Sequence, residues 1–138
     1  FNVNKSWLFK VGPSHLEKLD PLFIGGQELK WSNNVKYIGI ILVSAKDFKV
    51  GITVQVRKFY AAANAIMSNC KQVSDLVKLQ LLESFTLPLS TYACEALNLQ
   101  YTQVHQLSVC WNNTFRKIFH MNKWESVKII QLFCGRFD

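Results

Sequence analysis

The chain has 138 residues, of which 49% are hydrophobic and 18% charged, so it carries enough apolar material for a buried core. This composition excludes intrinsic disorder as the main state, because burial of the apolar surface can offset the lost chain entropy. Sixteen Lys and Arg against nine Asp and Glu give a formal net charge of +7. Such an excess favours anionic partners, nucleic acid before an acidic membrane surface. Both halves share the excess, which predicts a basic face across the molecule.

The ends and the cysteines indicate a segment of an intracellular protein. The sequence begins at Phe1 without a secretory signal pattern, and the longest apolar run, Ile38 to Val43, is far too short for a membrane span. We therefore expect a piece of a larger protein that is nuclear or cytoplasmic. The cysteines have no close partner of the kind that zinc sites use, so we expect buried, reduced thiols. They are Cys70, Cys94, Cys110 and Cys134.

Before residue 50 the pattern is that of strands separated by glycine. Trp7 to Val11 predicts a short strand, closed by Gly12-Pro13. Leu22 to Leu29 predicts a hairpin, because the paired glycines Gly25-Gly26 supply the positive φ of a two-residue turn. The β-branched run Val35 to Val43 predicts one buried strand.

After residue 50 apolar side chains recur with the helical period of about 3.6 residues. The first predicted helix runs from Val56 to Cys70, and the second runs from Ser74 or Asp75 to Glu83. Pro88 predicts a break before the segment resumes from Thr91 to Leu97.

Two further helices complete the prediction. One is capped by Thr102 and extends to Ile118, and the last begins in the capping-box pattern Asn122 to Glu125 and ends at Cys134. We therefore expect an α+β protein, in which a small antiparallel sheet over residues 1–50 precedes a bundle of three to four helices over residues 51–138.

The sequence shows no motif for catalysis or metal binding. The carboxylates are scattered singly, and the three histidines have no carboxylate or thiol at ligand spacing. The basic pairs Arg57-Lys58 and Arg116-Lys117 are more informative, because aromatic side chains accompany them. Basic groups interleaved with aromatic rings are typical of surfaces that follow a nucleic-acid backbone and stack its bases. The alternative is that the aromatic side chains face the core and the charges are only solvated.

Several segments, taken in order, resemble the last palm motifs and the thumb of non-LTR (LINE-type) retrotransposon reverse transcriptases. The resemblance spans nearly the whole chain, and its order and spacing are more specific than any single segment. It is carried by Phe1 to Ser6, Gly12-Pro13, Lys36 to Gly39, Arg57 to Asn64 with Asn69 to Lys71, Leu87 to Tyr92, Cys110 to Asn113, Phe115 to Phe119 and Lys123 to Val127.

The resemblance implies a role for particular residues. Lys5 matches the auxiliary catalytic lysine of motif D, which lies near the phosphates of the incoming nucleotide. Tyr37, Ile38 and Gly39 match the primer grip, although Ile38 stands where the family usually has Leu. The thumb residues implied to contact the backbone of an RNA–DNA hybrid are Arg57, Lys58, Asn64, Arg116 and Lys117.

The catalytic aspartate motifs of the family have no counterpart in the chain. We therefore expect a fragment of an RNA-directed DNA polymerase, a nucleotidyltransferase, that grips primer and template but is inactive alone. No cofactor or metal is expected in this chain, and Mg²⁺ only in the parent polymerase. The expected partners are the RNA–DNA hybrid or primer–template and the rest of the polymerase chain, with no membrane. The alternative is a degraded or domesticated remnant that serves as a non-enzymatic helical interaction or nucleic-acid-binding module.

Overall fold

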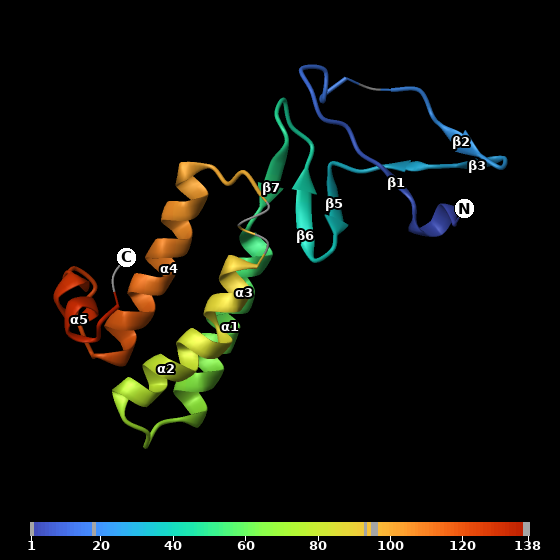
Figure 1. Cartoon of the computed structure of the whole chain (residues 1–138). Coiled ribbons are helices and arrows are strands. Elements are labelled where there is room, and N and C mark those ends of the chain that lie inside the picture. The colour runs from blue at the N-terminus through green and yellow to red at the C-terminus, as the bar shows by residue number, and fades with distance from the viewer. Residues whose placement is uncertain (1, 18, 93, 95–96, 137–138) are drawn as a thin grey trace. The chain divides into compact units, whose positions relative to one another are not determined.

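The computed structural model describes residues 2–17, 19–92, 94 and 97–136, and it divides the chain into two compact units, Phe1–Val54 and Gln55–Asp138. The strands lie in the first unit and most of the helical structure in the second (Figure 1). The predicted α+β class, a small antiparallel sheet followed by helices, is confirmed. The sheet includes a strand at Lys49–Gly51, so it extends across the predicted division after residue 50.

The first unit contains short strands in three small sheets. Strands β5, β6 and β7 form an antiparallel sheet in that order, β2 and β3 form a hairpin, and β1 pairs in parallel with β4. The elements are η1 (Val3–Lys5), β1 (Trp7–Leu8), β2 (Phe23–Ile24), β3 (Gln27–Glu28), β4 (Lys30–Trp31), β5 (Asn34–Tyr37), β6 (Ile40–Val43) and β7 (Lys49–Gly51).

One of the three strand predictions in this unit is confirmed, and the other two are wrong in their extent. The hairpin around Gly25-Gly26 is confirmed, and both residues have positive φ, 59° and 79°. The single strand predicted over Val35 to Val43 is wrong, because the chain reverses at Ile38 and Gly39 and forms the β5–β6 hairpin. The strand predicted over Trp7 to Val11 covers only Trp7–Leu8.

Hydrogen bonds attach the segment after β1 to the three-stranded sheet. Ser44 Oγ donates to the Lys10 carbonyl at 2.8 Å, and the Gly12 N–H donates to the Ala45 carbonyl at 3.0 Å. The apolar interior of this unit is small, and its buried side chains include Leu29, Ile40, Val50 and Ile52. Backbone pairing therefore contributes much of the order in this unit.

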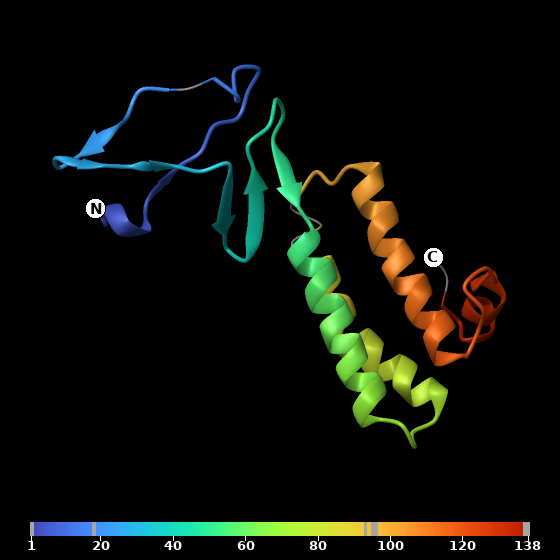
Figure 2. The same cartoon turned by 180° about the vertical axis from the view of Figure 1, so that it is seen from behind.

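The second unit is built on helices (Figure 2). Its core is an apolar cluster in which Leu82 and Phe115 are fully buried and Ile118 is 1% exposed. The same cluster contains Ala63, Leu79 and Val127. The helices are α1 (Thr53–Asn69), α2 (Asp75–Phe85), α3 (Leu87–Thr91), α4 (Tyr101–Ile118) and α5 (Lys128–Phe133).

The predicted break before Pro88 is confirmed at Thr86, which ends α2 and precedes α3. Thr86 is fully buried, and its Oγ1 donates to the Leu82 carbonyl at 2.6 Å. The helix predicted to resume from Thr91 to Leu97 is not seen at Tyr92, whose ψ of 122° is non-helical. Residues 93, 95 and 96 of that prediction lie outside the described part of the chain.

The remaining helix starts were only partly predicted. Asp75 begins α2 as expected, and Ser74 is its N-cap residue. The predicted Thr102 cap is wrong, because Gln100 caps α4 and forms a capping box with Gln103. Gln can perform this role because its side-chain carbonyl oxygen accepts hydrogen bonds from the backbone N–H groups that a helix N-terminus leaves without partners.

The capping-box pattern at Asn122 produces a turn and no helix. The Asn122 N–H does donate to Glu125 Oε2 at 3.1 Å, but α5 begins only at Lys128. Its predicted end is confirmed, since Gly135 has a φ of 67° and follows the cap residue Cys134. The Arg136 N–H then donates to the Gln131 carbonyl at 2.8 Å, as in a Schellman motif.

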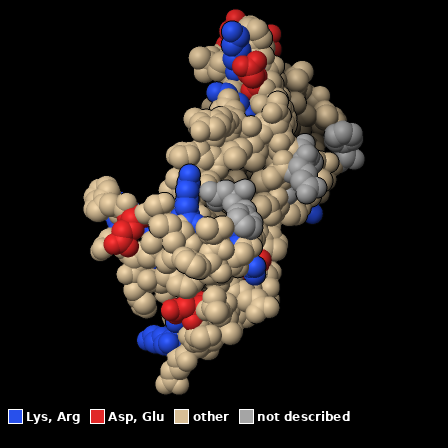
Figure 3. All heavy atoms as spheres, turned by 60° about the vertical axis from the view of Figure 1, so that its left-hand side comes forward, with Lys and Arg blue, Asp and Glu red and all other residues tan. Residues whose placement is uncertain are grey.

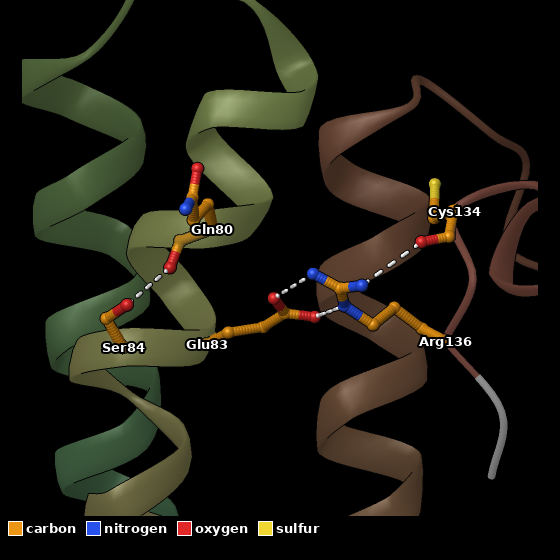
Figure 4. Close-up of polar contacts among 5 residues, drawn as sticks. All are labelled: Gln80, Glu83, Ser84, Cys134 and Arg136. Carbon is orange, nitrogen blue, oxygen red and sulfur yellow. Dashed lines mark hydrogen bonds and ion pairs between the residues drawn. The ribbon is translucent and has the colours of Figure 1, made fainter.

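A bidentate ion pair joins the end of α5 to α2 (Figure 4). The Arg136 guanidinium contacts both carboxylate oxygens of Glu83, with Nη2 at 2.8 Å from Oε2, and Nη1 also donates to the Cys134 carbonyl at 3.3 Å. The same view shows Ser84 Oγ donating to the Gln80 carbonyl within α2 at 2.9 Å. Hydrogen bonding to Glu83 raises the pKa of Arg136, so this cation stays charged and paired.

Two further expectations concern thiols and membranes. All four cysteines are free thiols, but only Cys110 is buried and the other three are half-buried. Across the described residues, none of the helices has the length and apolar character that crossing a membrane requires.

Replacement of core Leu82 by Ala should lower the free energy of unfolding of the second unit by about 2–5 kcal/mol, because it leaves a cavity in the cluster. Leu76 lies on the same helix with 63% of its side chain exposed, so Leu76→Ala should change stability by less than about 0.5 kcal/mol. Urea denaturation followed by helical circular dichroism measures both. Equal effects of the two variants would contradict this core assignment.

Candidate nucleic-acid interface

A polar surface spans α1 and α4 on the flank of the second unit's core. Lys117 Nζ on α4 donates to Asn64 Oδ1 on α1 at 2.7 Å, and both residues are exposed. The two residues are 53 apart in the sequence, so only helix packing brings them together. Three of the predicted nucleic-acid contacts therefore belong to one cross-helix surface, which we call the α1–α4 surface and define by Tyr60, Asn64, Asn113, Arg116 and Lys117.

Asn113 links the remaining members of the α1–α4 surface. Its Oδ1 accepts a hydrogen bond from Arg116 Nη1 at 3.1 Å, and its Nδ2 donates to Tyr60 Oη at 3.5 Å. Arg116 Nε donates in addition to the backbone carbonyl of Glu125 at 3.0 Å. The predicted set omitted Asn113, although its spacing of three and four residues from Arg116 and Lys117 places all three on one helix face.

Tyr60 occupies the inner edge of this surface and is half-buried. Burial of the phenol raises the pKa of Tyr60, and its contact with the Cys110 thiol acts in the same direction. The Asn113 amide, which donates to the phenol oxygen, acts in the opposite direction. The neutral phenol is therefore the form that the fold favours.

The two basic residues on α1, Arg57 and Lys58, lie in different directions around the helix axis. Arg57 and Asn64 are seven residues apart, which places them within about 20° of each other around the helix axis. Lys58 lies about 120° from Asn64 around the exposed side of α1, so the two residues border opposite edges of the stripe that buries Phe59 and Ala63. Both basic residues are exposed, but Arg57 alone extends the α1–α4 surface.

The aromatic residues near the basic pairs pack mostly inward. Phe59 is 1% exposed and meets Trp111 edge to face, with ring centroids 6.5 Å apart. Trp111 in turn contacts Phe115 in the core at 5.2 Å. Stacking of bases on Phe59 is therefore excluded by its burial. Trp124 is 87% exposed, and Lys123 Nζ lies 5.2 Å from its ring centroid.

In the first unit, the three residues predicted to form a primer grip lie at the tip of the β5–β6 hairpin. Ile38 and Gly39 are the two turn residues between the paired Tyr37 and Ile40, and both have positive φ, 46° and 79°. This combination of positive φ values is that of a type I′ turn, which favours Asn-Gly and disfavours a β-branched residue. Tyr37 and Ile38 are 63% and 65% exposed, so the turn presents two large apolar side chains to solvent.

The remaining features of the candidate site are Lys5, the groups that could hold a metal ion and the distribution of charge on the surface. Lys5 ends η1 and is exposed. Within the described residues, no group of three or more His, Cys, Asp or Glu side chains could hold a metal ion. On the face shown in Figure 3, the described Lys and Arg side chains stand apart, with acidic and uncharged side chains between them, so this face is not continuously basic.

No protein-family model, curated protein or solved structure matches this chain. A function therefore rests on the residues, their geometry and the resemblance to polymerase motifs.

Replacement of Ile38 by Asn should raise the free energy of unfolding of the hairpin unit by about 1 kcal/mol, because Asn adopts positive φ with less strain. Ile38→Thr is the matched control, since Thr is also polar but keeps the β-branch and should give no gain. Thermal unfolding of the full chain measures both. A gain with Thr as large as that with Asn would show that backbone strain is not the cause.

The pKa of Tyr60 gives a prediction of stability against pH. Because its folded pKa is raised, the folded chain holds the proton above about pH 10, where the unfolded chain has lost it. The contribution is complete below that pH and is lost as the pH rises through the folded pKa. Wild type should therefore lose stability more steeply than Tyr60→Phe in alkaline denaturation series. Parallel profiles would contradict the assignment.

Proposed function

We propose that this chain is the nucleic-acid-gripping part of an RNA-directed DNA polymerase of the non-LTR retrotransposon type. In this proposal, the second unit binds the RNA–DNA hybrid through its backbone, as a thumb does, and the β5–β6 hairpin contacts the primer strand. The observation that carries the proposal is the α1–α4 surface, where predicted contact residues from two helices are held by two hydrogen-bonded groups, Lys117 with Asn64 and Arg116 with Asn113 and Tyr60.

The way its cations are held supports backbone binding. Lys117 and Arg116 donate to amide and carbonyl oxygens, which orient the side chains without neutralising their charge. A positive group that is already oriented loses less conformational entropy when it meets a phosphate. Such contacts position a duplex and carry no base information.

The hairpin tip gives independent support from the first unit. A β-branched residue at positive φ costs about 1–3 kcal/mol, and the turn leaves Tyr37 and Ile38 63% and 65% exposed. This exposure of two large apolar side chains at a strained turn supports a contact outside the unit. Contact of the exposed tip with a primer strand would account for it, and Gly39 would permit close approach of the backbone.

The polymerisation chemistry belongs, in this proposal, to the rest of the polymerase chain. Nucleotide transfer needs carboxylates that hold two Mg²⁺ ions, whereas Lys5 could supply only an auxiliary positive charge or proton. The role proposed for the described residues is to hold primer and template in register for that chemistry.

A second candidate function is favoured by one feature of α5. Ile129, Leu132 and Phe133 share one helix face and are 64%, 58% and 84% exposed. An apolar face of this kind suits a protein partner, as expected for a helical interaction module. The same face would equally suit the rest of the polymerase chain, so only a binding measurement separates the two functions.

Titration of the full chain with an RNA–DNA hybrid and with single-stranded RNA, repeated across salt concentrations, tests the proposed function. We expect preference for the hybrid, with a log–log salt slope that reflects several phosphate contacts at about 0.9 per contact. Arg57→Gln should weaken binding to hybrids of every sequence, because it removes a phosphate contact.

Lys58→Gln is the matched control, since it removes the same charge from the neighbouring position on the other flank of α1. Equal loss in both variants would show that net charge, and not the α1–α4 surface, governs affinity. If the folded wild type binds neither ligand at low salt, the interaction-module function replaces the polymerase one.

A further inference from the structure

A shallow hollow of about 360 Å³ lies beside the last turn of α4. Two of its basic side chains, Arg116 and Lys117, come from the helix, and the third, Lys123, comes from the turn that follows. The lining is completed by Asn113 and Met121. Three positive groups and one amide therefore share a single depression of the second unit.

A reversal of the chain brings Lys123 back to the helix. His120 has a φ of 51°, and the Met121 N–H then donates to the Arg116 carbonyl at 2.8 Å. The next turn is closed by Glu125, whose N–H donates to the Asn122 carbonyl at 3.1 Å. These backbone bonds hold the third cation within the same hollow as the other two.

Among the described residues, no carboxylate forms an ion pair with a cation of the hollow. The ion pairs found between described residues join Lys10 to Glu17, Lys78 to Asp75 and Arg136 to Glu83, and none includes a cation of the hollow. The nearby carboxylate of Glu125 accepts hydrogen bonds from the backbone and side chain of Asn122. Like charges gathered in this way repel one another, and an anion in the hollow would relieve that repulsion.

The dipole of α4 explains only part of the arrangement. Basic residues in the last turn of a helix interact favourably with its carbonyl end, which accounts for Arg116 and Lys117. It does not account for Lys123, which lies beyond the helix, nor for the hollow that the three side chains line.

We propose that this hollow seats one backbone phosphate of a bound nucleic acid, with Lys123 as a contact additional to those on the helices. The inference rests on the proposed function and extends it to a specific subsite. The Arg116 guanidinium, fixed by Asn113 and by the Glu125 carbonyl, presents its remaining N–H groups to the phosphate oxygens. The ammonium groups of Lys117 and Lys123, which line the same hollow, supply point charges.

The test compares Lys123→Gln with Lys128→Gln in the full chain. Both variants remove one positive charge from an exposed lysine. Lys128 begins α5 and does not line the hollow, so it is the matched control. In RNA–DNA hybrid titrations, Lys123→Gln should lower the salt slope by about 0.9 and the affinity by about eightfold at 0.1 M salt. Lys128→Gln should change the affinity by less than about twofold, since it removes no direct phosphate contact.

The outcomes separate this subsite from the proposed function. If wild type binds the hybrid and the two lysine variants lose affinity equally, the subsite is wrong while hybrid binding stands. If wild type does not bind the hybrid at all, both are wrong. Binding to phosphatidylserine vesicles that is lost in Lys123→Gln, without hybrid binding, would show that the hollow takes a lipid headgroup and would overturn the nucleic-acid assignment.

Discussion

Burial of Leu82 and Phe115 where α2 and α4 meet is the contact on which the second unit's surface depends. Both side chains are fully buried, and Ala63 from α1 joins the same cluster. This packing brings α1 and α4 close enough for Lys117 to reach Asn64 at 2.7 Å. The candidate interface is thus a consequence of the apolar core beneath it, because its own exposed hydrogen bonds are too weak to position two helices.

Arg136, Arg116 and Lys117 differ in the kind of oxygen that accepts their hydrogen bonds. Arg136 is paired with Glu83, and the pair connects the end of α5 to α2 (Figure 4). Arg116 and Lys117 are held by neutral oxygens and keep their charge available to an anion. The net charge of +7 is therefore a poorer guide to anion binding than whether each cation is paired with a carboxylate or with a neutral oxygen.

Residues close together in the sequence were sufficient to predict several turns and helix ends. The turn at Gly25-Gly26, the break at Thr86 before Pro88 and the end of α5 before Gly135 all follow from backbone restrictions within a few residues. Prediction failed where the same local pattern has two solutions. One hydrogen bond of a capping box, from the Asn122 N–H to Glu125, forms without a helix, and the β-branched run before Val43 reverses direction at Ile38.

The sequence by itself determined the α+β class, the helical period of the second half and the candidate basic residues, because each depends on near neighbours in the chain. Only the tertiary structure decided which basic residues act together. Asn64 and Lys117 are distant in the sequence yet hydrogen-bonded, whereas the separation of Arg57 from Lys58 by about 100° around α1 follows from the helical period alone. The physical reason is that a binding surface is set by which helix faces the core covers, and that depends on long-range packing of Leu82 and Phe115.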